Sequence, residues 1–179
     1  LLSKHPEHKG RFTFIQVGVP SRSQIKEYQA VDNQIQHLVE DINWRHRMGS
    51  WEPIIYLRRY FSSTPLWALY SIADMCIVSS LQDGMNLVAK EYVAARNDRN
   101  GVLILSKFTG AASELTGPLL VNPYDTQEFA HTIAEALKMS PSEQRQRMER
   151  MRAYLQENDV YRWAIRVLNE LSRVEAPAI

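Results

Sequence analysis

Residues 79–92 read SSLQDGMNLVAKEY, a polar turn that joins an apolar run to a helix-forming segment. The apolar run, residues 75–79, suits a short strand that is buried on both faces of a sheet. The turn contains Asp83-Gly84, and the residues from Asn86 onward favour a helix. Because a buried strand that leads directly into a helix is the repeating unit of parallel α/β sheets, this stretch predicts the α/β class.

The same alternation recurs along the chain. Other short, apolar, β-rich runs cover residues 12–19, 54–58, 102–106 and 119–121. After the first of them, apolar residues follow the three-and-four spacing of an amphipathic helix, at Ile25, Tyr28, Val31, Ile35, Leu38, Val39 and Ile42. Strand and helix alternate to the end of the sheet, which predicts a Rossmann-like open parallel sheet with helices on both faces.

Capping residues mark the expected starts of the later helices. The candidates are Thr64, which precedes a proline, then Asp125 or Thr126, and Ser140. Ser140 is followed three residues later by Glu143, the pattern of a capping box. A last helix is expected at about residues 161–174, and in a longer protein it could cross to another domain or pair with a second copy.

The composition excludes several classes of protein. The chain has 179 residues, with 21 Lys or Arg against 20 Asp or Glu, so the formal net charge is +1. A net charge this small produces no strong electrostatic field that would favour binding to nucleic acid or to a membrane surface. We therefore expect small-molecule partners. No apolar stretch approaches the roughly 20 residues that span a bilayer, and no signal-peptide pattern opens the chain, which favours a cytoplasmic location. The chain begins without Met, and we expect a fragment.

The loop at residues 80–86 carries the most informative pattern for ligand binding. Ligands of open α/β sheets bind beyond the carboxyl ends of the strands, where helix N-termini present free N–H groups. Here Gly84 allows a backbone to approach a ligand closely, and the N–H groups of Asn86, Leu87 and Val88 would favour a diphosphate. The carboxylates of Asp83 and Glu91 could accept hydrogen bonds from a hexose and a ribose. On spacing alone, an ordinary turn, cap and exposed charge remain the alternative.

Four segments carry a resemblance to a known family. Residues 83–94 read DGMNLVAKEYVA, which resembles the signature of the trehalose-6-phosphate synthases. Three other segments agree in order and spacing: VPSR at 19–22 with EYQ at 27–29, LSKFTGAA at 105–112, and VNPY at 121–124. The similarity extends over about residues 12–124, most of the chain.

The resemblance implies an architecture and a reaction. Members have two facing Rossmann-like domains, the GT-B arrangement, and residues 1–179 would be the C-terminal, donor-binding domain, without the N-terminal acceptor domain. The implied reaction is retaining transfer of glucose from UDP-glucose to glucose 6-phosphate, which gives trehalose 6-phosphate and UDP. The family's cations at the donor phosphates and its acceptor-sugar residues lie upstream of Leu1, so we expect this chain to be inactive alone.

The resemblance also implies roles for particular residues. Asp83 would be the catalytic-site carboxylate that holds donor-sugar hydroxyls, helped by the backbone N–H groups of Gly84, Met85 and Asn86. The remaining donor contacts would be backbone N–H groups of Leu87 and Val88 at the diphosphate, Glu91 at the ribose, and Val17 with Phe61 at the base. Arg22 matches the arginine that binds the acceptor phosphate, a role that suits a guanidinium fork.

Neither a metal nor another cofactor is expected. The sequence has no Asp-x-Asp motif, and its histidines are scattered without a pair at ligand spacing, at His5, His8, His37, His46 and His131. The single cysteine, Cys76, lies in an apolar run and is expected to be a buried, inert thiol. In this family the donor phosphate and the acceptor meet on one face of the sugar, so no protein nucleophile is needed.

Three alternatives stay open or are set aside at this point. A related synthase could use another phosphorylated acceptor, as in glucosylglycerol-phosphate synthase. A catalytically silent regulatory subunit is a second alternative, although Asp83, Asn86 and Glu91 are in place. A dinucleotide-dependent oxidoreductase is disfavoured, because none of the seven glycines forms a Gly-x-Gly-x-x-Gly turn. A homo-oligomer is compatible with the sequence.

Overall fold

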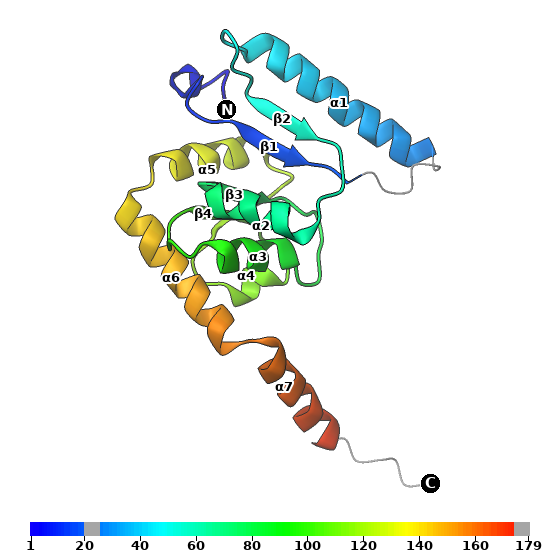
Figure 1. Cartoon of the computed structure of the whole chain (residues 1–179), viewed down its shortest axis with the longest axis vertical. Helices are drawn as coiled ribbons and strands as arrows, with labels where there is room; N and C mark the ends of the chain where they lie inside the picture. Colours follow the sequence, from blue (N-terminus) through cyan, green and yellow to red (C-terminus); the bar gives the residue numbers. More distant parts are fainter. Residues whose placement is uncertain (20–25, 174–179) are drawn as a thin grey trace. The chain divides into compact units, whose positions relative to one another are not determined.

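A computed structural model describes residues 1–19 and 26–173 (Figure 1). The chain divides into two compact units, Leu1–Thr64 and Pro65–Ile179. The first unit contains η1 (Pro6–His8), β1 (Phe14–Val17), α1 (Lys26–His46) and β2 (Ile54–Leu57). From α2 onward the elements are α2 (Ser63–Ile72), β3 (Met75–Val78), α3 (Leu87–Ala95), β4 (Val102–Ser106), α4 (Ala111–Glu114), β5 (Leu119–Val121), α5 (Thr126–Lys138), α6 (Pro141–Glu157) and α7 (Val160–Arg173).

The strands of the described residues pair in parallel, as the sequence predicts, but they form two sheets. β1 pairs with β2, and β4 lies between β3 and β5. The expected single sheet is therefore not continuous among the described residues.

The core of the second unit is built around β4. All five residues of β4 are buried, and their side chains alternate between the two faces of the sheet. Leu103 and Leu105 pack in one cluster with residues of α3 and α6, whereas Val102 and Ile104 pack in another with Ala136 of α5. Figure 1 shows α5 on one side of the sheet and α3 with α6 on the other. The predicted helices on both faces are confirmed for this unit.

In the first unit, α1 is joined to β2 by polar contacts. The Asn43 side chain pairs with the backbone of Ile54, donating to its oxygen at 2.8 Å and accepting from its N–H at 3.0 Å. The hydroxyl of Tyr56 donates to Asp32 at 3.1 Å. No described residue of α1 is buried, and its apolar stripe stays largely exposed, with Leu38 at 60%.

The predicted helix starts are mostly confirmed. Asp125 caps α5 by accepting from two backbone N–H groups, and the Ser140 hydroxyl accepts from the N–H of Glu143 at 3.3 Å. α2 begins at Ser63, so Thr64 lies within the first turn instead of at the cap. Proline is tolerated throughout the first turn of a helix, because the N–H groups there have no acceptor within the helix. A proline in the sequence therefore locates the start of a helix only to within a turn.

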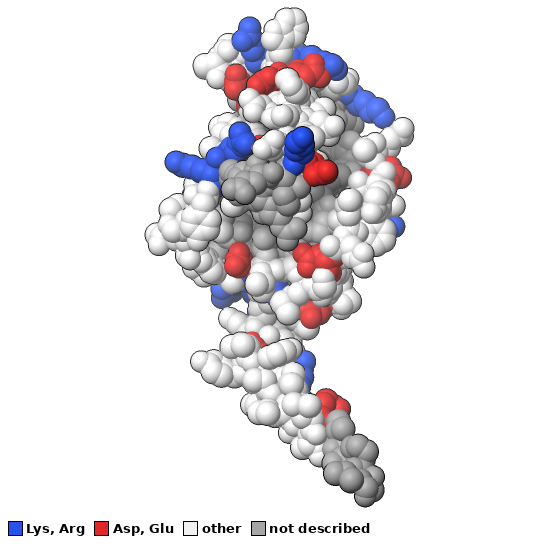
Figure 2. Space-filling model, turned by 90° about the vertical axis from the view of Figure 1, so that its right-hand side faces the viewer, with Lys and Arg blue, Asp and Glu red and all other residues white. Residues whose placement is uncertain are grey.

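Two surface properties agree with the composition. On the face drawn in Figure 2, acidic and basic side chains lie among one another, with no broad area of a single sign. None of the described helices combines the length and apolar character that crossing a membrane requires.

Candidate functional site

The loop between β3 and α3, residues 79–86, holds Asp83 in one orientation. The Asp83 carboxylate accepts from the N–H of Met85 at 3.0 Å through Oδ1, and from the Asn86 side-chain amide at 3.0 Å through Oδ2. The bond from Met85 and then the bond from Asn86 lower the pKa of Asp83 below its ordinary value. Asp83 is thus an ionised acceptor at neutral pH, oriented by its own loop.

A second loop, residues 107–110 between β4 and α4, fixes the position of the first. The N–H of Asp83 donates to the oxygen of Phe108 at 3.2 Å, and the N–H of Gly110 donates back to the oxygen of Asp83 at 3.0 Å. The N–H of Ala111 donates to the oxygen of Met85 at 2.8 Å. A Cβ on Gly110 would lie 2.1 Å from the oxygen of Gly84, so only glycine fits here. These contacts, which we call the loop clamp, give the LSKFTGAA segment a structural role.

The start of α3 presents free N–H groups. Asn86 is the N-cap, and its side-chain oxygen accepts from the N–H of Ala89 at 2.9 Å. It has φ +76°, in the left-handed region that asparagine tolerates better than most residues. No hydrogen bond of the described residues uses the N–H of Leu87 or Val88, and both residues are exposed. A helix N-terminus with free N–H groups is a favourable place for a phosphate.

Glu91 lies one turn into α3 from Leu87, on the same side of the helix. The hydroxyl of Tyr70, on α2, donates to Glu91 Oε2 at 3.3 Å. Desolvation and then the charge of Glu91 raise the pKa of Tyr70, so this phenol stays protonated and remains a donor. Tyr70 could not be identified as part of the site from its sequence position, because a tyrosine on an apolar helix face is usually a core residue.

Other residues predicted to bind substrates lie in different parts of the chain. Val17 is the last residue of β1, and Phe61 follows β2 in the chain. Because the two strands are parallel, their carboxyl ends lie at the same edge of the β1-β2 sheet. Both are half-buried, and the Arg59 guanidinium lies over the Phe61 ring, 4.6 Å from its centroid. Arg22, the predicted acceptor-phosphate ligand, lies outside the described residues.

Cys76 does not offer a nucleophile. It lies in β3, and desolvation by burial raises the pKa of its thiol to about 12. The thiolate, which is the reactive form, is therefore scarce at neutral pH. This agrees with the expectation of an inert thiol, although Cys76 is half-buried and not fully buried as expected.

Comparisons with known proteins identify the family. Residues 1–173 match the model of glycosyltransferase family 20. The chain is 39% identical over 176 residues to alpha,alpha-trehalose-phosphate synthase [UDP-forming] A of Dictyostelium discoideum, with 98% of this chain and 24% of the relative covered. It is 38% identical to the E. coli trehalose-6-phosphate structure bound with UDP-2-fluoro glucose, with a TM-score of 0.93 and 97% of this chain and 39% of that chain covered.

A second solved structure is an alpha,alpha-trehalose-phosphate synthase (UDP-forming) from Burkholderia xenovorans in complex with glucose-6-phosphate. It is 37% identical, with a TM-score of 0.91, and the match covers 96% of this chain and 38% of that one. The chain thus spans about a quarter of the Dictyostelium relative and about two fifths of each solved chain. Because the family model matches nearly its whole length and the fold agrees, the chain belongs to glycosyltransferase family 20.

Proposed function

We propose that this chain is the donor-binding half of a retaining glucosyltransferase that forms trehalose 6-phosphate and UDP from UDP-glucose and glucose 6-phosphate. The observation that carries the proposal is the β3–α3 loop, where an oriented carboxylate, Asp83, stands next to the free N–H groups that open α3. The relatives support the substrates, because the solved structures were bound with UDP-2-fluoro glucose and with glucose-6-phosphate.

In this proposal the diphosphate lies at the N-terminus of α3. The N–H groups of Leu87 and Val88 donate to its oxygens, where negative charge builds as UDP leaves. The helix dipole adds the equivalent of about half a positive charge at this end. Donors that are already in place need no reorganisation during the reaction, so they favour the transition state over the bound substrate.

The glucose lies over Gly84, with its hydroxyls donating to the ionised Asp83. A Cβ built on Gly84 would meet no atom within 4 Å, so there is open space next to Gly84 for the sugar. Glu91, oriented by Tyr70, accepts from the ribose hydroxyls. The base contacts of Val17 and Phe61 and the acceptor contact of Arg22 stay predictions.

We further propose that donor binding needs no divalent cation and that this chain does not catalyse transfer alone. The N–H groups at the start of α3 replace part of the charge that a metal would supply. The chain matches 39% of the E. coli chain, so the other residues of a complete site would come from the remainder. A mixture of chain, UDP-glucose and glucose 6-phosphate should give no trehalose 6-phosphate, and EDTA should leave UDP-glucose binding unchanged.

Ligand-observed NMR tests the donor site directly. The chain should bind UDP-glucose and UDP more tightly than GDP-mannose. Asp83→Asn and Glu91→Gln should each weaken binding of UDP-glucose about tenfold, because each removes a charged hydrogen-bond acceptor. Glu135→Gln, on the exposed side of α5, is the matched control and should bind as the unaltered chain does. Equal affinity of all three variants would refute the assignment.

The same measurement tests the silent-subunit alternative but does not distinguish between acceptors. A silent regulatory subunit should show no preference for uridine nucleotides, whereas a synthase with another phosphorylated acceptor should bind UDP-glucose through the same residues. The identity of the acceptor, the cytoplasmic location and the oligomeric state stay predictions.

A further inference from the structure

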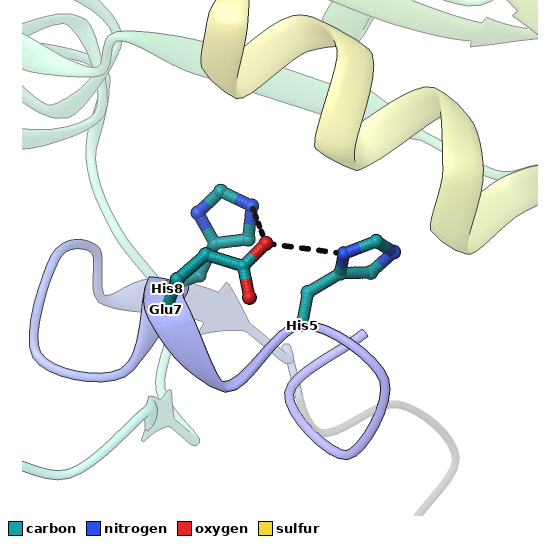
Figure 3. A group of neighbouring side chains, drawn as sticks. All are labelled: His5, Glu7 and His8. Atoms are coloured by element: carbon teal, nitrogen blue, oxygen red, sulfur yellow. Dashed lines mark hydrogen bonds and ion pairs between the residues drawn. The ribbon is translucent and has the colours of Figure 1, made fainter.

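A short turn near the start of the chain brings together three metal-binding residue types. His5, Glu7 and His8 lie on η1 and at its cap, with Pro6 fixing the backbone at its first position (Figure 3). A 3-10 helix has three residues per turn, so residues i and i+3 lie on the same side. The structure thereby corrects the expectation of scattered histidines: His5 and His8 stand on one side of a single turn.

The side-chain geometry approaches that of a metal site. Glu7 Oε1 lies 3.2 Å from His5 Nδ1 and 3.9 Å from His8 Nε2. One ligand atom from each of the three residues lies within 4.8 Å of the others. Ligands of tetrahedral Zn²⁺ at 2.0–2.1 Å stand about 3.4 Å apart, so His5 and Glu7 already have this spacing. Rotation of the partly exposed His5 and Glu7 side chains would bring their ligand atoms closer to His8 Nε2.

His8 provides an independent indication of a ligand. Its side chain is only 8% exposed, and its Nε2 atom is buried without a hydrogen-bond partner among the described residues. The 3.9 Å separation from Glu7 is too long for a hydrogen bond. In Figure 3 the carboxylate of Glu7 lies between the two imidazole rings. A bound ion would account for a buried ring nitrogen that lies 3.9 Å from a carboxylate and makes no hydrogen bond among the described residues.

We propose that His5, Glu7 and His8 bind a divalent transition-metal ion, of which Zn²⁺ is the best fit, with water completing the coordination. Two imidazoles and one carboxylate suit zinc and its neighbours, whereas Mg²⁺ and Ca²⁺ prefer sites made of oxygen. The site shares no residue with the β3–α3 loop. It would hold together the turn that leads into β1, so its role is structural.

Zinc titration followed by NMR of the histidine side chains tests the site. In chelator-treated buffer, Zn²⁺ should bind one ion per chain and shift the imidazole signals of His5 and His8. His37 is the matched control, because it also stands near one carboxylate, Glu40 at 3.9 Å, but no third ligand lies beside it in the described part of the chain. Its signal should not move at one equivalent of Zn²⁺, and the same concentration of Mg²⁺ should shift no histidine signal.

Variants measured by calorimetry complete the test. His5→Gln and Glu7→Gln should each weaken Zn²⁺ binding at least tenfold, and His37→Gln should leave it unchanged. His5 and Glu7 are partly exposed, so these variants should fold even if a change at buried His8 does not. Unaltered affinity in His5→Gln and Glu7→Gln, or no saturable binding by the unaltered chain, would overturn the proposal.

Discussion

Replacing Gly110 by alanine should separate the two loops that form the loop clamp. The added Cβ would lie 2.1 Å from the oxygen and 2.9 Å from the carbonyl carbon of Gly84, both backbone atoms that no rotamer change can move. The loops must therefore shift apart, which breaks or stretches the hydrogen bonds from Gly110 and Ala111. Two lost hydrogen bonds of about 1 kcal/mol each and overpacking of about 1–3 kcal/mol predict a loss of about 3–5 kcal/mol.

Gly84→Ala is the matched control, because its methyl group would meet no atom within 4 Å and the residue has no positive φ. Its stability should stay within about 0.5 kcal/mol of the unaltered chain. The methyl group would, however, occupy the space proposed for the donor glucose, so the affinity for UDP-glucose should fall. Urea unfolding and NMR titration measure the two effects separately. If Gly110→Ala unfolds at the same urea concentration as the unaltered chain, the loop clamp is wrong.

Three further predictions concern individual side chains. Tyr70→Phe removes the donor to Glu91 and should weaken UDP-glucose binding about two- to tenfold in the NMR titration, with stability little changed. Arg96→Met removes a buried guanidinium that donates to three backbone oxygens and to Asp98, and should cost about 3–5 kcal/mol in urea unfolding. The Asp83 pKa is lower in the folded chain than in the unfolded one, so its stabilisation is present above about pH 4 and is lost as the pH falls through the folded-state pKa. The difference in urea midpoint between the unaltered chain and Asp83→Asn should thus shrink as the pH is lowered from 7 into that range.

The sequence predicted the strands and helix caps well, because these depend on local patterns. β4 is a continuous apolar run between polar segments, and it is observed at its predicted bounds. Asn86 and Asp125 follow the ordinary chemistry of helix N-termini. The pairing of the strands in two sheets was not predicted, because adjacency of strands is a property of topology and not of local composition.

The proposed histidine site and the loop clamp could not be predicted from the sequence for a similar reason. The spacing of His5 and His8 matters only when the backbone between them forms a 3-10 turn, which three residues are too few to reveal by periodicity. Gly110 could be marked as unusual only by resemblance, since its close neighbour Gly84 is distant in sequence. Contacts between such loops depend on which strands are neighbours in the sheet. They can therefore be identified only once the strand order is known.

The β3–α3 loop also solves an electrostatic problem. A carboxylate next to a diphosphate would repel it, and both groups seek N–H donors at the same helix end. Here the N–H of Met85 goes to Asp83 and the N–H of Ala89 to Asn86, which leaves those of Leu87 and Val88 for another anion. The Asn86 side chain also donates to Asp83 Oδ2, so one residue both caps the helix and fixes the orientation of the carboxylate. In the proposed donor site, the loop would therefore present a carboxylate acceptor for the sugar and N–H donors for the diphosphate side by side.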